Sequence, residues 1–280
     1  MSAVVEQKTS QGWPAKLDII FSKRQLKTII ASLKHFGPLR VQRPFYPELD
    51  VCHVYLLHPP GGVVGGDTLD ISVTTKENSH ALLTTPGSAK FYRSAGDHAR
   101  VNQDFTIHNK TRLEWFPQEN ILFPGAKVKI KTTIRLEVDA EFIGWEINCL
   151  GRPANNERFD SGELDAVLKL YRGEQLLLCE RQRVNHQRHL SALAGLRDYP
   201  MNALFLCTSC TEMHLSLVRE AIDKLAPEFP VGVTLIDDVL VLRLLGYQTE
   251  PMQKIMIAAW KVLRPQILKK DAVLPRIWST

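Results

Sequence analysis

Long apolar runs are missing from this 280-residue sequence, which contains no stretch of about 18 consecutive apolar residues. The segment from Met1 to Lys8 also lacks the basic start and apolar centre of a secretory signal peptide. We therefore expect a cytoplasmic protein with no membrane association.

Cysteine is scarce as well. The five cysteines are odd in number and scattered, which argues against a disulfide framework and for reduced thiols. They are Cys52, Cys149, Cys179, Cys207 and Cys210.

Common catalytic signatures are also absent. The sequence has no Gly-x-Ser-x-Gly nucleophile elbow, no His-Glu-x-x-His metal motif and no Cys/His pattern with a matching signature. We therefore expect a protein that is not an enzyme in its own right.

The charge balance is mild. Lys and Arg number 35 against 30 Asp and Glu, a net charge of +5 without long like-charge runs. Such a balance does not predict nucleic-acid binding, whereas a modestly basic surface would suit acidic protein partners. The 44% of apolar residues is ample for a sizeable core.

Alternation of apolar and polar residues is the main pattern from about residue 17 to 181, for example in 53–57, 128–138 and 164–171. This period of two, rich in β-branched residues, predicts strands with one buried face. The fold class expected is mainly β, with stacked antiparallel or mixed sheets that are β-helix-like or sandwich-like.

The period changes in the last seventy residues. A helical spacing predicts one helix near 210–226, with Ser209 and Glu212 as a capping box, and a second near 250–264 with Thr249 as a candidate cap. Two strands are expected between them, with Asp237 and Asp238 as the candidate turn of a hairpin. We find no internal sequence repeat, so the prediction is one domain over 1–280: β-rich from 17 to 200 and α/β from 201 to 280.

The most unusual segment is 58–69, which carries four glycines and two prolines. Such a composition indicates special backbone angles or close backbone approach. A phosphate-binding loop would end in Gly-Lys-Ser/Thr, but Asp67 and Thr68 follow the last glycine, and the carboxylate would repel phosphate. We therefore expect a structural or partner-binding loop.

A cluster of two cations and two aromatic residues follows at 90–93, after the turn Pro86-Gly87-Ser88. Aromatic and Arg side chains make effective interface anchors, although a strand end with solvated cations is the alternative. The residues assigned to the loop and this cluster are Pro60, Gly61, Gly62, Gly65, Gly66, Asp67, Lys90, Tyr92 and Arg93.

Four blocks, 58–69, 83–93, 113–125 and 144–153, resemble the urease accessory protein UreD family in residues, order and spacing. The resemblance covers roughly residues 55 to 170, and 180–200 carries no family motif. It implies a nickel-insertion chaperone that binds urease apoprotein and recruits the accessory proteins UreF and UreG, the latter a GTPase. Nickel would then be in transit, with no tightly bound cofactor.

Several carboxylates lie on or beside predicted strands in apolar surroundings, where a charge is costly unless it is paired or hydrated. A wet internal path would remove that cost, and carboxylates could pass a borderline ion such as nickel along without trapping it. For each one, a salt bridge with Arg112, Arg152 or another cation is an equally open interpretation. Glu141 belongs to this group, and the residues assigned to a metal path are Glu114, Glu119, Asp139 and Glu146.

Cys207 and Cys210, with His214 nearby, have a spacing compatible with soft metal binding. The alternative is that Cys207 ends a buried strand, where cysteine behaves as a small apolar residue. His186 and His189 fit a solvated turn better than a chelating pair. A metal- or thiol-dependent enzyme built on the carboxylates or on Cys207 and Cys210 is the competing class of function.

Overall fold

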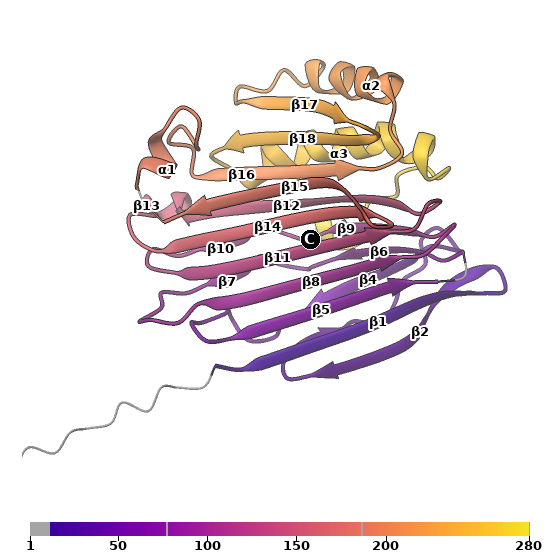
Figure 1. The fold of residues 1–280 in the computed structure, drawn as a ribbon, viewed down its shortest axis with the longest axis horizontal. Helices are drawn as coiled ribbons and strands as arrows, with labels where there is room; N and C mark the ends of the chain where they lie inside the picture. Colours follow the sequence, from indigo (N-terminus) through magenta and orange to yellow (C-terminus); the bar gives the residue numbers. More distant parts are fainter. Residues whose placement is uncertain (1–11, 77, 186, 280) are drawn as a thin grey trace, which may run out of the picture.

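The computed structural model describes residues 12–76, 78–185 and 187–279. It is mainly β, as predicted, and has three layers: two stacked sheets and a layer of helices behind the second sheet (Figure 1). We call the sheet nearest the viewer in Figure 1 the front sheet and the other the back sheet.

The front sheet has seven strands in the order β15-β14-β11-β8-β5-β1-β2. The five strands from β14 to β1 run parallel, and the two edge strands pair antiparallel with their neighbours. The bounds are β1 Pro14–Arg24, β2 Lys27–Phe36, β5 Thr68–Thr75, β8 Ala99–Ile107, β11 Lys127–Leu136, β14 Glu163–Arg172 and β15 Gln175–Val184.

The back sheet follows the order β17-β18-β16-β12-β9-β6-β4-β3, with β10 and β13 paired to β12 and β7 paired to β10. Strands β4, β6, β9 and β12 are parallel, and β16, β18 and β17 continue antiparallel. The bounds are β3 Arg40–Val41, β4 Cys52–Leu57, β6 His80–Thr84, β7 Ala89–Phe91, β9 Arg112–Phe116, β10 Asn120–Leu122, β12 Glu141–Arg152, β13 Glu157–Arg158, β16 Met201–Cys207, β17 Val231–Ile236 and β18 Val239–Gly246.

The chain passes alternately from one sheet to the other, so the parallel strands form a solenoid-like stack. Successive coils lie in register, with Thr68 beside Arg100 and Ala99 beside Val128. Alternating burial along each strand directs one row of side chains into the space between the sheets. The coils therefore share a burial pattern although they share no sequence repeat.

Two larger helices cover the back sheet, and a short one, α1 (Gln187–Ser191), follows β15. The prediction of a hairpin around Asp237 and Asp238 is confirmed, since β17 and β18 pair antiparallel across those residues. Helix α2 (Glu212–Asp223) begins two residues later than predicted, and α3 (Thr249–Ile267) runs three residues beyond its predicted end.

The predicted caps are wrong in detail. Ser209 adopts a left-handed backbone (φ 61°), whereas a cap residue needs the extended conformation that Thr211 has. The capping box therefore pairs Thr211 with His214, whose Nδ1 accepts from the Thr211 backbone N–H at 3.0 Å. For α3, the extended residue is Gln248, and Thr249 is already helical.

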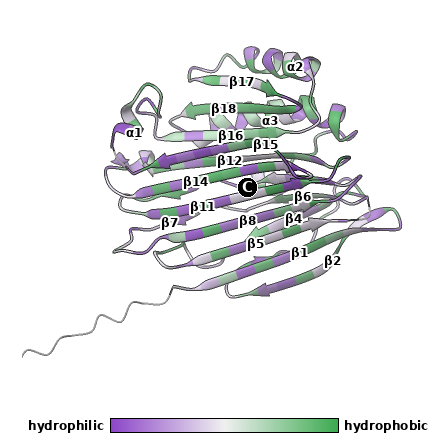
Figure 2. Cartoon of the chain, in the orientation of Figure 1, coloured by the Kyte–Doolittle hydropathy of each residue, from purple (hydrophilic) through white to green (hydrophobic). Residues whose placement is uncertain are grey.

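The apolar core is divided by the back sheet into two parts. One cluster fills the space between the two sheets, and the other lies between the back sheet and helices α2 and α3, around the fully buried Trp260. Figure 2 shows the alternation of polar and apolar residues along the front strands. Within the described ranges, no helix combines the length and the apolar character needed to cross a bilayer.

Candidate functional site

The alternation of side chains along β9 and β12 separates two of the sequence-predicted carboxylates. In register, Glu114 lies beside Ile143, and Trp115 lies beside Gly144. Because neighbours in register share a face, Glu114 faces the helices while Trp115, Gly144 and Glu146 face the front sheet. The two glutamates therefore lie on opposite faces of the back sheet, in different layers of the protein.

Glu146 lies inside the protein between the two sheets. It lines a cavity but has no hydrogen-bond or ion-pair partner among the described residues. Burial raises its pKa to about 7, and the negative charge of Glu180 on β15 adds to this effect. Its carboxyl group is therefore partly protonated near neutral pH, unlike a surface glutamate.

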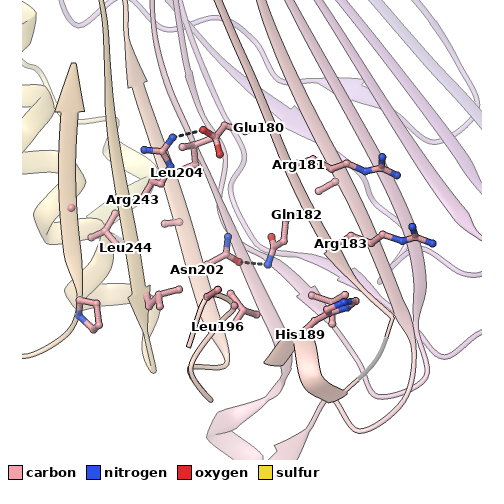
Figure 3. A pocket seen from close by; sticks show the side chains of 18 of the residues that line it. Glu180, Arg181, Gln182, Arg183, His189, Leu196, Asn202, Leu204, Arg243 and Leu244 are labelled. Carbon is pink, nitrogen blue, oxygen red and sulfur yellow. Dashed lines mark hydrogen bonds and ion pairs between the residues drawn. The ribbon is translucent and has the colours of Figure 1, made fainter. Parts of the chain in front are cut away.

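Three cavities follow one another between the sheets. The largest, about 800 Å³, lies between β15, α1, β16 and the β17–β18 hairpin (Figure 3). It shares Glu146 with a small void of about 10 Å³, and that void shares Gln103 and Trp115 with a third cavity of about 490 Å³. A void of that size holds about one water molecule, so Glu146 stands at a constriction between two larger spaces.

Amide side chains line the approach to the constriction in a hydrogen-bonded chain. The Asn120 amide donates to Asn148 at 3.0 Å, Asn148 donates to Gln182 at 3.1 Å, and Gln182 donates to Asn202 at 2.9 Å. Gln182 projects from the front sheet to bond with Asn148 and Asn202 of the back sheet, and Figure 3 shows its bond to Asn202. This chain ties the two sheets together with groups that can also solvate a cation.

Opposite charges and a hydroxyl complete the lining. Arg243 on β18 donates to Glu180 on β15 across the large cavity (Figure 3). At the constriction, the Thr132 hydroxyl donates to the side-chain oxygen of Gln103 at 3.0 Å. Neither pair is predictable from local sequence patterns, because the partners come from strands that are distant in sequence.

The Gly/Pro loop forms one wall of the third cavity, together with the turn at 85–90. The Asp67 carboxylate accepts from the backbone N–H groups of Trp13 (2.8 Å) and Val64 (2.9 Å), so it fixes the loop itself. Gly66 has φ +93°, whereas at Gly65 a side chain would meet the backbone oxygen of Asp97 at 2.6 Å. The two glycines are required for different reasons.

The cluster at 90–93 packs against the same loop. The Tyr92 hydroxyl donates to the Gly61 carbonyl at 3.1 Å, and its ring contacts Phe123 edge-on at 4.8 Å between centroids. Lys90 and Arg93 are exposed on either side of it. The structure thus brings all the predicted loop residues together on the side of the stack where the chain passes from the back sheet to the front sheet, and their contact with a partner stays a prediction.

Glu114 belongs to a buried ionic cluster that joins α3 to the back sheet. Its carboxylate accepts from the Trp260 indole at 2.6 Å, from Arg264 at 2.9 Å and from His80 at 2.7 Å. Arg264 also donates to Glu48 at 2.7 Å, and Glu48 in turn contacts His53. We call these residues, with Trp260 included, the α3 clamp.

The buried ionic surroundings shift the pKa of Glu114. Burial raises it, but the hydrogen bond from His80 and the charge of Arg264 outweigh burial and lower the pKa to about 2. Glu114 is therefore ionised and fully used in packing. Sequence reasoning missed Glu48, His80 and Arg264, because no local pattern links residues up to 216 positions apart.

The other two carboxylates assigned to the path line none of the three cavities. The Glu119 carboxylate accepts a hydrogen bond from Ser88 at 2.8 Å. Its neighbours in sequence, Gln118 and Asn120, do line the third cavity. Asp139 lies exposed in the turn between β11 and β12. Glu141 pairs with Arg112 at 2.7 Å, which is the salt bridge that the sequence analysis left open.

Cys207 and Cys210 are both buried and free, and Cys207 ends strand β16 as expected. Burial, and next the hydrogen bond to Cys210, raise the pKa of the Cys207 thiol, which opposes thiolate chemistry. Within the described ranges, no three His, Cys, Asp or Glu side chains are grouped so that they could hold a metal. His189 lies in α1 rather than in a turn, and His186 lies outside the described residues.

Comparison with known proteins identifies the family of this chain. The model of the UreD urease accessory protein family matches residues 14–279. The urease accessory protein UreD of Alcanivorax borkumensis is 54% identical over 274 residues, covering 96% of this chain and 93% of that protein. The UreD proteins of Citrobacter koseri (45%, covering 100% and 96%) and Pseudomonas putida (43%, covering 99% and 98%) are also similar. With matches that span nearly the whole chain, this protein belongs to the UreD family of urease accessory proteins.

Proposed function

We propose that this protein is a scaffold for nickel insertion into urease, and that it acts in the cytoplasm. In this role it binds urease apoprotein together with UreF- and UreG-like accessory proteins. It provides a route for the ion and performs no chemistry of its own. The observation that carries the proposal is the row of three cavities with Glu146 at the constriction between them.

The lining chemistry suits an ion in transit. Nickel accepts carboxylate, amide and water oxygen, but it is held firmly only where several strong ligands converge. Glu146 offers one carboxylate, with amide groups and water-sized space around it, and Glu180, another carboxylate that lines the large cavity, is already paired with Arg243. A carboxyl group with a pKa of about 7 also exchanges the ion for a proton easily near neutral pH.

The constriction sets a limit on the form of the ion. A void of about 10 Å³ admits about one water molecule and cannot admit an ion with its full shell of water. The ion therefore exchanges part of its water for protein oxygens at Glu146, or the side chains around it move aside. Both alternatives make the rate of passage sensitive to the volume and charge of residue 146.

The test compares substitutions at one position. Glu146→Gln keeps the shape and removes the charge, and Glu146→Leu also removes the polarity, so nickel content and activity of recovered urease should fall in the order wild type, Gln, Leu. Glu119→Leu should also lower both, because it removes the hydrogen bond to Ser88, which lines the third cavity. Glu220→Gln, a carboxylate paired with Lys224 on the surface of α2, is the matched control. Pull-down from the same preparations shows whether the complex still forms.

Wild-type nickel content in Glu146→Leu, with the complex intact, would refute the route. Failure of the wild-type protein to pull down urease apoprotein and the accessory proteins would refute the scaffold role itself. Retained nickel in the purified protein at one ion per chain would instead favour a resident metal site.

A further inference from the structure

The two sheets of this protein differ in what covers their outer faces. Helices α2 and α3 pack on the outer face of the back sheet, where they bury a second apolar core. No described element covers the outer face of the front sheet, which lies open toward the viewer in Figure 1. Strand β15 belongs to this face and also bounds the largest cavity, which Arg181, Gln182 and Arg183 line.

The part of this face formed by β8, β11, β14 and β15 is strongly basic. Eight cations point outward from it against three carboxylates, a net charge of +5 that equals the charge of the whole chain. We call it the basic face. Its cations are Arg100, Lys127, Lys129, Lys131, Arg135, Lys169, Arg181 and Arg183, and its carboxylates are Asp104, Glu163 and Asp165.

Strand registers show how these charges are arranged. Arg100, Lys129, Asp165 and Arg183 stand in one row across four strands, so three cations share a row with one carboxylate. Arg100 and Lys129 are direct neighbours, a like-charge pair that destabilises a sheet. Figure 3 shows the side chain of Arg183 pointing away from that of the neighbouring Gln182, which bonds to Asn202.

The three carboxylates are already paired within the face. Asp104 contacts Arg135 at 3.3 Å, Asp165 contacts Arg181 at 2.9 Å and Glu163 contacts Lys127 at 3.6 Å. The remaining five cations have no carboxylate within ion-pair distance among the described residues. They are Arg100, Lys129, Lys131, Lys169 and Arg183.

We infer that the basic face docks an acidic surface of a folded protein. Like-charged neighbours on an uncovered sheet cost stability, and carboxylates from outside would offset that cost. The four strands span roughly 15 Å by about 26 Å from the usual strand spacing and rise. That is about half of the ~800 Å² that each partner contributes to a standard interface, so the face can form the centre of one.

The pattern favours protein over nucleic acid as the partner. An open sheet with paired carboxylates among its cations presents a mixed pattern of charge, and Tyr171 is the one aromatic residue in these rows. Binding of single-stranded nucleic acid uses a groove with several aromatic stacking platforms, which these rows lack. The partner we assign, resting on the proposed function, is urease apoprotein.

The test uses a quadruple reversal, Lys129→Glu/Lys131→Glu/Lys169→Glu/Arg183→Glu, in the full chain co-expressed with its accessory partners. The matched control reverses four other exposed cations, Lys23, Arg24, Arg219 and Lys261, which form no ion pair with a carboxylate of the described residues. Binding to immobilised urease apoprotein is measured at low and high salt, and the melting temperature is measured as a check on folding. Each exposed ion pair strengthens the binding constant by up to about a factor of five. The binding constant should therefore fall between about 10-fold and 100-fold in the quadruple variant and stay unchanged in the control.

Three outcomes would overturn the inference. These are wild-type binding by the quadruple variant, an equal loss in the control, and a loss that nuclease treatment abolishes. Weaker binding by the folded quadruple variant, together with wild-type binding by the control and salt-sensitive wild-type binding, would support it. If the wild type itself fails to bind urease apoprotein, the proposed function fails first and the inference fails with it.

Discussion

Replacing Arg264 by methionine should destabilise the protein by about 3–5 kcal/mol, the usual cost of removing one partner from a buried ion pair. The side chains of Arg264 and Glu114 are both fully buried, and Glu48 is nearly so. Methionine keeps much of the volume but leaves both carboxylates without their shared cation. For a chain of 280 residues, this loss corresponds to a fall in melting temperature of roughly 5–9 °C.

The direction of the pH dependence follows from Glu114. Its pKa is about 2 in the folded protein, below the ordinary value of 4.5, so its stabilising contribution is present above the unfolded pKa. That contribution, about 3 kcal/mol from the shift, is lost as the pH falls from about 4.5 to 2. In Glu114→Gln the stability should therefore depend less on pH over this window.

The assay is urea unfolding of the wild type, Arg264→Met, Glu114→Gln and the double variant, followed by circular dichroism. Glu114→Gln in the Arg264→Met background should restore part of the lost stability, because it removes one of the two stranded carboxylates. Simple additivity of the two substitutions, or a loss below 1 kcal/mol in Arg264→Met, would refute the role of the α3 clamp.

Three further predictions concern the loop, the thiols and the interior glutamate. Gly66→Val forces a branched residue to φ +93°, and the Gly65→Val side chain meets the backbone of Asp97, so each variant should reduce urease activation and lower the melting temperature. Gly61→Ala has open space around it and should do neither. Wild-type behaviour of both valine variants would contradict the rigid-loop interpretation. Cys207→Ala/Cys210→Ala should leave the nickel content of recovered urease unchanged, and a loss of nickel with an intact complex would transfer the metal role to these thiols. Burial makes the ionised form of Glu146 unfavourable, as its raised pKa of about 7 shows. Glu146→Gln should therefore stabilise the protein at pH 8 by up to about 3 kcal/mol but not at pH 4. Equal unfolding midpoints for variant and wild type at pH 8 would contradict this burial effect.

Local patterns in the sequence predicted the elements better than their assembly. The alternation in 128–138 identified β11 within one or two residues at each end, and the hairpin around Asp237 was placed correctly. These features depend on neighbouring residues alone. The solenoid-like stacking was included among the expected folds but could not be singled out, because its coils repeat a burial pattern without repeating a sequence.

The metal path shows where local reasoning was incomplete. Glu114 and Glu146 were grouped because both stand among aromatic residues on strands, yet the side chains of the two strands alternate so that they face opposite layers. The alternation within 113–116 could have placed Leu113 and Trp115 on one face and Glu114 on the other. Nothing in the sequence could have predicted that Arg264, 150 positions away, pairs with Glu114.

The same alternation explains how charged residues of the α3 clamp, the interior route and the basic face can stay separate in one fold. On β12, an even-numbered residue such as Glu146 faces the front sheet, whereas the odd-numbered Ile147 packs toward the helices. On β15, Gln182 reaches into the interior and Arg183 faces solvent. A shift of one residue in either strand would exchange these roles and place a cation in the interior or a carboxylate in the helical core. The clamp, the interior route and the basic face can therefore be tested separately, because substitutions in one row leave the other rows in place.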